Sequence, residues 1–133
     1  MARENVNVAQ KALDAFNRRD KAGWLGLTDP DMEVLPPRDW PESDPIRGSE
    51  AAWNFYVQNI EAFREGVLEH VELIEAGNDS VVAHMRGEIQ GKVSDASVAF
   101  SYWPVSTFRN GKTVRTEWFA DRLSALEAVG LRE

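Results

Sequence analysis

The stretch Trp103–Leu131, WPVSTFRNGKTVRTEWFADRLSALEAVGL, holds the strongest local signals in the chain. Its Asn110-Gly111 pair is the preferred sequence of a two-residue type I′ turn, because both positions of that turn need positive φ. The segments on either side, Val98–Phe108 and Thr113–Phe119, are rich in β-branched and aromatic residues and are predicted to be paired strands. Asp121 follows as the predicted N-cap of a final helix.

The Asn110-Gly111 turn also predicts a register for this hairpin. Counting outward from the turn pairs Val105 with Thr116, and Trp103 with Trp118. Directly paired residues share a face of the sheet, so the two tryptophans are expected side by side. Pro104 lacks an amide donor and could mark a bulge that shifts the register beyond it. The opposite face is expected to carry the pairs Ser106/Arg115, Pro104/Glu117 and Tyr102/Phe119.

Helices are predicted before the strands. Apolar residues at helical spacing predict a helix over residues 4–19, and Asp20 can cap a short second helix that carries Trp24. Residues 36–48 hold four of the six prolines and are predicted to be a loop. A third helix opens at Ser49.

Three further strands are predicted at Met32–Leu35, Val67–Glu75 and Val81–Gln90, the last two from period-two alternation. Helices, one short strand, a helix and then four strands in meander order describe an α+β domain. We expect a cone-shaped, curved antiparallel sheet wrapped around helices. A chain of 133 residues suits a single domain over residues 1–133.

The composition excludes several classes of function. A formal net charge of −7 gives no attraction to phosphate backbones or anionic lipids, so neither nucleic acid nor a membrane surface is an expected partner. The absence of cysteine excludes disulfides, thiol nucleophiles and thiolate metal sites. No signal-peptide core is present and no apolar run reaches the roughly 20 residues of a membrane span, so a cytoplasmic location is expected by default.

Three motifs resemble those of the SnoaL-like proteins of the nuclear transport factor 2-like superfamily. They are IRGSEA at Ile46–Ala51, RNGKTVR at Arg109–Arg115, and FADR leading into ALEAVGL within Phe119–Leu131. Their order and spacing extend over nearly the whole chain. The resemblance implies an α+β barrel shaped as a cone, with a pocket inside and commonly a dimer through the outer face of the sheet. Relatives include polyketide cyclases, ketosteroid isomerases and limonene epoxide hydrolases.

Aligning this chain with the catalytic residues of two kinds of relative gives a mostly negative result. Limonene epoxide hydrolases place an Arg and two Asp where this chain has Met85, Gly87 and Trp118. Ketosteroid isomerases place a general-base Asp where this chain has Leu35-Pro36. The catalytic residues therefore stay unknown. Asp121 is the one candidate carboxylate, at the mouth end of the last strand, and its capping role already explains it.

The aromatic residues point to a ligand pocket. Five Trp are many for a chain of this length, and each could simply fill the core. However, indole N–H groups need partners or a wet cavity edge, and aromatic cavities with a few polar groups are the usual form of small-molecule sites. The residues expected to line such a pocket are Trp24, Trp40, Tyr56, Met85, Trp103, Thr116 and Trp118.

The other face of the sheet is expected to be polar and to lie away from the pocket. Its predicted members are His84, Arg86, Glu88, Arg115 and Glu117. We interpret them as a homodimer interface or a solvent-facing patch. His84 has no ligand cluster around it, so no metal site is expected. His70 is interpreted as exposed or at an interface.

Two functions remain open from the sequence. One is a site for a small apolar, ring-containing compound, which could serve an isomerase, cyclase or dehydratase that needs a positioned acid or base and no cofactor. The alternative is a non-catalytic homodimeric binding or assembly module with a largely filled cone. A cavity with an acid–base side chain pointing into it would favour the first.

Overall fold

Four helices and six strands make up the fold, in a computed structural model that describes residues 2–38, 40, 44–61, 63–91 and 97–131. The helices are α1 (Ala2–Asn17), α2 (Lys21–Gly26), α3 (Ser49–Glu61) and α4 (Arg122–Ala128). The strands are β1 (Thr28–Leu35), β2 (Ile46–Arg47), β3 (Phe63–Ala76), β4 (Ser80–Gly91), β5 (Ser97–Arg109) and β6 (Lys112–Phe119). None of the helices in this part of the chain is long and apolar enough to cross a membrane.

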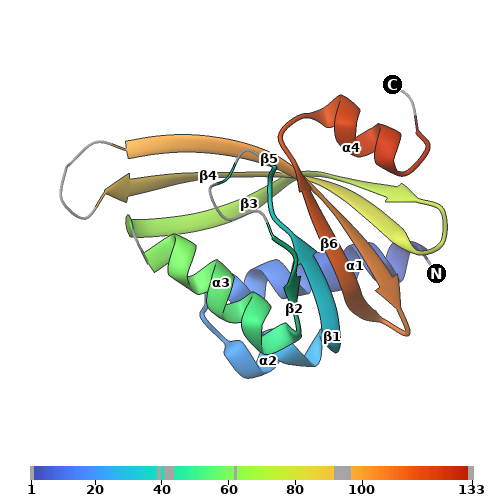
Figure 1. Cartoon of the computed structure of the whole chain (residues 1–133), viewed down its shortest axis with the longest axis horizontal. Coiled ribbons are helices and arrows are strands. Elements are labelled where there is room, and N and C mark those ends of the chain that lie inside the picture. Colours follow the sequence, from blue (N-terminus) through green and yellow to red (C-terminus); the bar gives the residue numbers. More distant parts are fainter. Residues whose placement is uncertain (1, 39, 41–43, 62, 92–96, 132–133) are drawn as a thin grey trace.

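The six strands form one curved sheet in the order β2-β1-β6-β5-β4-β3. Helices α1, α2 and α3 lie against one face, and α4 lies on the other face (Figure 1). The sheet does not close, because β2 and β3 remain its two edges. The expected α+β fold, a curved sheet wrapped around helices, is therefore confirmed.

Two details of the sheet differ from the prediction. The pairing of β1 with β6 is parallel, whereas a wholly antiparallel sheet was expected. No tight turn joins these two strands, so local sequence places no constraint on their direction. The proline-rich loop also contains the short strand β2, where Ile46 pairs with Val34 of β1.

Hydrogen bonds fix the starts of the first two helices. Asp20 caps α2 by accepting a hydrogen bond from the Gly23 amide at 3.0 Å, as predicted. The Asn5 side chain is buried in α1 and donates to the Asn78 carbonyl oxygen at 3.0 Å. This bond ties the start of α1 to the turn between β3 and β4.

The turn between β5 and β6 is at the predicted residues, but the register beyond it is not. Asn110 and Gly111 have φ of 55° and 75°, as a type I′ turn requires. The prediction that Trp103 pairs with Trp118 is wrong, because β6 contains an extra residue, Val114, between the pairs Phe108/Thr113 and Thr107/Arg115. The bulge lies beside the turn and not at Pro104.

One extra residue reverses the alternation of side chains for everything beyond it. Trp118 therefore pairs with Pro104, while Trp103 pairs with Phe119. Trp103 and Trp118 lie on opposite faces of the sheet. Likewise Tyr102, Pro104 and Ser106, which were expected on the outer face, are on the inner one.

A second offset lies in β3. His70 pairs with Met85 and Glu72 with His84, so Val71 is an extra residue relative to β4. Beyond it Leu73 pairs with Ala83. The offset puts His70 on the same face of the sheet as Met85.

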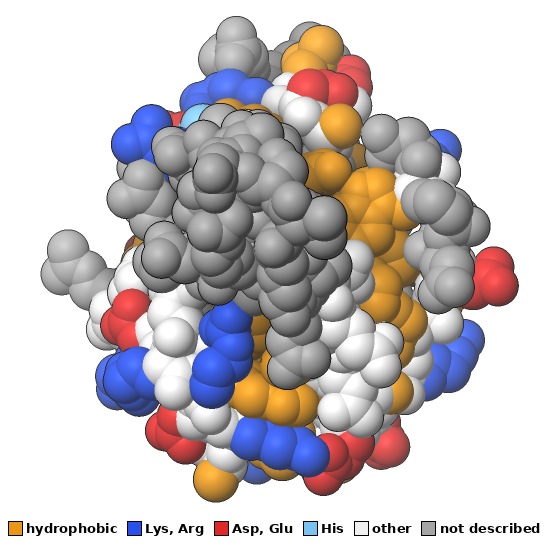
Figure 2. Space-filling view, turned by 90° about the vertical axis from the view of Figure 1, so that its left-hand side faces the viewer, with side chains coloured by type: hydrophobic (Ala, Val, Ile, Leu, Met, Phe, Trp, Pro, Cys, Tyr) orange, Lys and Arg blue, Asp and Glu red, His pale blue; other side chains and the backbone are white. Residues whose placement is uncertain are grey.

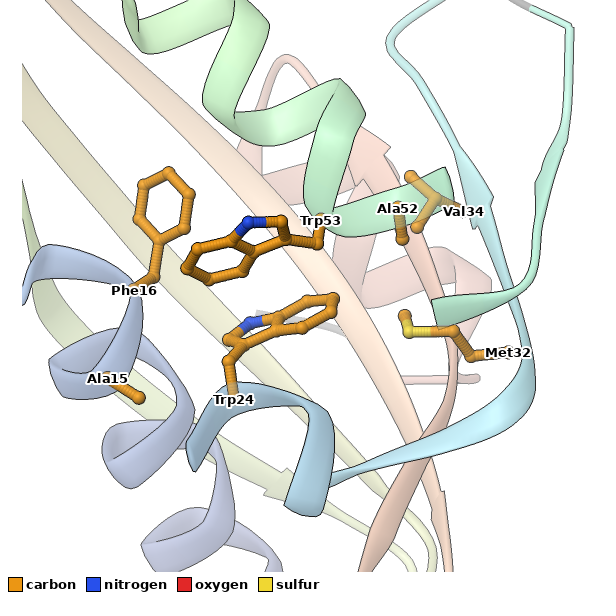
Figure 3. Close-up of a cluster of buried hydrophobic side chains, with 7 residues drawn as sticks. All are labelled: Ala15, Phe16, Trp24, Met32, Val34, Ala52 and Trp53. Atoms are coloured by element: carbon orange, nitrogen blue, oxygen red, sulfur yellow. The ribbon is translucent and has the colours of Figure 1, made fainter. Parts of the chain in front are cut away.

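The main core lies between the helices and β1. Its buried side chains come from α1, α2, α3 and β1 (Figure 3). Trp24 and Trp53 have ring centroids 5.5 Å apart, and Phe16 meets Trp53 edge-on at 5.6 Å. Tyr56 and Trp118 pack against this cluster, so the core continues into the inner face of the sheet.

A smaller core lies under α4 on the outer face. Val82, Trp103, Val105, Ala125 and Leu126 are buried together there. Leu126 anchors the helix in this core, whereas Leu123 of the same helix is 54% exposed.

Truncating Leu126 to alanine should lower the free energy of unfolding by about 2–3 kcal/mol, because a fully buried leucine leaves a cavity. The matched change Leu123→Ala on the same helix should cost less than about 0.5 kcal/mol. Urea denaturation of both variants measures the difference. Equal losses would show that α4 does not pack on the sheet as described.

Candidate functional site

A cavity of about 410 Å³ lies between the helices and the inner face of the sheet. At the end of the molecule where α3 meets β3 in Figure 1, hydrophobic side chains form a band on the surface with charged groups around it (Figure 2). Seven aromatic side chains line the cavity, namely Phe16, Trp24, Trp40, Phe55, Tyr56, Tyr102 and Trp118. Among the described lining residues there is no Asp, Glu, Lys or Arg.

Six of the seven side chains expected at a ligand pocket line this one cavity. They are Trp24, Trp40, Tyr56, Met85, Thr116 and Trp118. Trp103 does not, because the bulge at Val114 turns it to the outer face under α4. The same offset brings in Tyr102, Pro104 and Ser106, which the predicted register left out.

Two hydrogen bonds between an indole and a phenol hold the cavity wall. Trp118 Nε1 donates to the Tyr56 hydroxyl at 3.0 Å, and Trp40 Nε1 donates to the Tyr102 hydroxyl at 2.9 Å. Burial raises the pKa of Tyr56 well above its usual value, against a smaller lowering by the Trp118 bond. Tyr56 therefore keeps its proton at neutral pH.

His70 is the residue that the sequence prediction missed. It is half-buried and lines the cavity, and its Nδ1 lies 3.1 Å from the Gln10 Oε1 of α1. Burial lowers the pKa of His70 from 6.5 to about 4, while the charge of Asp14 acts weakly in the opposite direction. The imidazole is therefore neutral at pH 7. Nothing in the alternation around His70 signals the offset at Val71 that turns it inward.

The outer face carries the predicted polar residues, several of them in contact within the monomer. His84 stacks on Trp103 with ring centroids 4.1 Å apart, and its Nε2 lies 2.6 Å from the Ser101 hydroxyl. Arg115 lies 3.7 Å from Glu33 and 3.6 Å from Glu117. The side chain of Glu88 lies outside those that the structure describes. A homodimer through this face, with Arg86 in it, stays a prediction.

Asp121 has the capping role that was expected of it. Its carboxylate accepts from the Ser124 amide at 2.8 Å and from the Ser124 hydroxyl at 3.1 Å. The amide bond first, and the hydroxyl bond second, lower the pKa of Asp121. It is absent from the lining of the cavity, so the geometry offers it no part in a reaction there.

Below pH 6.5 the free energy of unfolding should depend on the protonation of His70. The folded pKa of about 4 lies below the ordinary 6.5, so the unfolded chain binds the proton more tightly and stability falls as the pH drops from 6.5 towards 4. Between pH 7 and pH 4.5 the wild type should lose about 2 kcal/mol more unfolding free energy than His70→Asn. Urea denaturation at both pH values measures this, and an identical pH dependence would contradict a buried neutral imidazole.

The fold has counterparts in solved structures. RV0760c from Mycobacterium tuberculosis, in complex with estradiol-17beta-hemisuccinate, is 16% identical, with 89% of this chain and 94% of that chain covered and a TM-score of 0.74. A protein of unknown function from Burkholderia pseudomallei K96243 is 21% identical, with coverages of 96% and 98% and a TM-score of 0.75. TerC, co-crystallised with polyporic acid, is 22% identical, with coverages of 95% and 97% and a TM-score of 0.75.

At these identities the likeness shows the fold alone, which is that of nuclear transport factor 2-like proteins. None of the curated proteins matches the sequence. The SnoaL-like domain family matches residues 9–116, which form most of the chain and include all of the cavity wall except Trp118. The chain therefore belongs to the SnoaL-like domain family.

Proposed function

We propose that the cavity binds a small apolar organic molecule that contains at least one ring. The observation that carries this proposal is the wall of seven aromatic side chains around about 410 Å³ of space. Ligand sites in proteins typically measure about 300–1,000 Å³ and are lined mainly by apolar and aromatic groups with a few polar ones. The cavity has both properties.

The chemistry of the wall sets the class of ligand. Ring compounds make favourable edge-to-face and offset contacts with aromatic side chains. A charged ligand would lose its hydration without gaining an ion pair, because no charged side chain is found among the described lining residues. Neutral ring compounds are therefore favoured over sugar phosphates, amino acids or nucleotides.

Two proteins of the same fold support a small-molecule function. RV0760c was solved with estradiol-17beta-hemisuccinate and TerC with polyporic acid. The alternative, an assembly module with a filled cone, fits less well because the cone contains the cavity.

Catalysis by an isomerase, cyclase or dehydratase is the second candidate. Of the described lining residues, His70 is the one whose side chain titrates below the range of a tyrosine hydroxyl. Proton transfer is most efficient when the pKa of the base is near the working pH, and a pKa of about 4 makes His70 a weak base at pH 7. Binding is therefore the better supported function.

Ring compounds should quench tryptophan fluorescence in a saturable way, because three indoles line the cavity. The change Ala9→Phe fills part of the cavity from α1. It should weaken binding at least tenfold, because the new ring takes the space in which the ligand contacts the wall. The matched change Ala51→Phe at an exposed position of α3 should leave binding unchanged. Fluorescence titration with a panel of neutral ring compounds measures all three proteins.

A second pair of variants tests which tryptophan gives the fluorescence change on binding. Trp118→Phe should remove part of the fluorescence change, since Trp118 lines the cavity. Trp103→Phe should leave the change intact, since Trp103 lies under α4 on the outer face. No saturable response from any compound of the panel would refute the proposed function.

Cyclic ketones bound in the cavity should not exchange carbon-bound hydrogen for deuterium any faster with wild type than with His70→Asn. The reason is the weak basicity of a buried imidazole with a pKa of about 4. Proton NMR in D₂O measures the rate of exchange. An exchange that depends on His70 would instead establish proton-transfer catalysis at this site.

A further inference from the structure

We infer that a relay from Asp14 through Gln10 fixes His70 as a hydrogen-bond acceptor at Nε2, so that the cavity selects ring compounds carrying a phenolic or enolic hydroxyl. The inference rests on the proposed function and names the polar group that the ligand carries. Its basis is a chain of two hydrogen bonds whose directions follow from the chemistry of the atoms involved.

The first bond joins two residues one turn apart on α1. Gln10 Nε2 lies 3.0 Å from Asp14 Oδ1 at the surface of the helix. A carboxylate only accepts hydrogen bonds, so Gln10 must turn its NH₂ group towards it. This orients the amide and leaves its Oε1 directed at β3.

The second bond joins α1 to β3. Gln10 Oε1 lies 3.1 Å from His70 Nδ1. An amide oxygen has no hydrogen to donate, so Nδ1 must carry the proton of the neutral ring. The relay therefore selects the tautomer in which Nε2 holds a lone pair.

The lone pair is open to a ligand. In the part of the chain that the structure describes, every fully buried side-chain nitrogen or oxygen has a hydrogen-bond partner. His70 Nε2 has none among the described residues, so this atom is not fully buried, and the ring to which it belongs lines the cavity. An accessible acceptor that the protein itself does not satisfy is left for the bound molecule.

Other polar groups of the cavity wall that the structure describes form hydrogen bonds elsewhere and not to Nε2. The Ser106 and Thr116 hydroxyls lie 3.1 Å apart and share one hydrogen bond. The Tyr56 hydroxyl accepts from Trp118 Nε1. Hydroxyls adapt to either role, whereas Nε2 in this tautomer only accepts. A ligand without a donor leaves Nε2 desolvated and unpaired, which weakens its binding.

The test compares 2-naphthol with 2-methoxynaphthalene, because methylation removes the donor and keeps the ring. Wild type at pH 7 should bind 2-naphthol about tenfold more tightly, as expected for one hydrogen bond in a largely apolar site. His70→Leu should bind both compounds with similar affinity. Calorimetric titration gives the affinity of each.

Gln10 tests the relay, because it is a positioning residue outside the lining of the cavity. Gln10→Leu should bring the ratio of the affinities for 2-naphthol and 2-methoxynaphthalene towards one. Gln10→Glu keeps an acceptor for Nδ1–H and should retain the preference for 2-naphthol. Long-range ¹H–¹⁵N correlations should show an unprotonated Nε2 in wild type and a mixture of tautomers in Gln10→Leu. Partial unfolding of a variant would lower both affinities. It would not by itself abolish the preference in Gln10→Leu and retain it in Gln10→Glu.

The outcomes separate the two proposals. If neither naphthalene nor any other ring compound binds wild type, the proposed function fails. If 2-naphthol and its methyl ether bind wild type equally well, the proposed function stands and the relay inference is wrong. Should the Gln10 variants not fold, the wild-type tautomer decides, and a proton on His70 Nε2 would overturn the inference.

Discussion

Two single-residue offsets in the sheet, at Val71 of β3 and Val114 of β6, determine which side chains of these strands face the cavity. Side chains alternate strictly along a strand, so one inserted residue exchanges the inner and outer sets beyond it. The offset in β6 sets Trp118 inward and leaves Trp103 for α4. The offset in β3 sets His70 inward. The aromatic rings that the sheet contributes to the wall, Tyr102 and Trp118, and the imidazole of His70 thus depend on the same kind of backbone feature.

The wall itself is held by bonds between distant segments. Trp40 in the loop after β1 bonds Tyr102 of β5, and Trp118 of β6 bonds Tyr56 of α3. In both cases a phenol oxygen accepts from the indole N–H in place of water, so these two tryptophans line the cavity with their donors paired. The polar atoms of these aromatics therefore serve the cavity's shape, and His70 is left as the acceptor for the ligand.

Features encoded within a few residues could be predicted from the sequence. The Asn110-Gly111 turn and the caps at Asp20 and Asp121 have local signatures, and each lies where it was expected. The bulge at Val114 has no such signature, because a valine there suits a regular strand equally well. The parallel pairing of β1 with β6 depends on segments far apart in the chain.

The candidate site likewise contains residues that the sequence could predict and residues that it could not. Aromatic residues could be expected at a cavity from their type alone, and four of the five that were expected there line it. The expected position of the fifth, Trp103, depended on a register that the bulge changes. His70 could not be found, because its interior position depends on Val71 and its tautomer depends on Gln10, 60 residues away.

A cavity with these walls can be selective although its described lining residues include no charged side chain. Burying about 250 Å² of apolar ligand surface is worth roughly 6 kcal/mol at 25 cal/mol per Å². The freedom lost on binding costs at least about 4 kcal/mol, so apolar contact alone leaves a weak and unselective complex. One satisfied hydrogen bond, worth about 1.4 kcal/mol, then changes the affinity about tenfold. The burial that keeps His70 neutral also increases the contribution of that bond to binding, because a ligand without a donor leaves Nε2 with neither water nor partner.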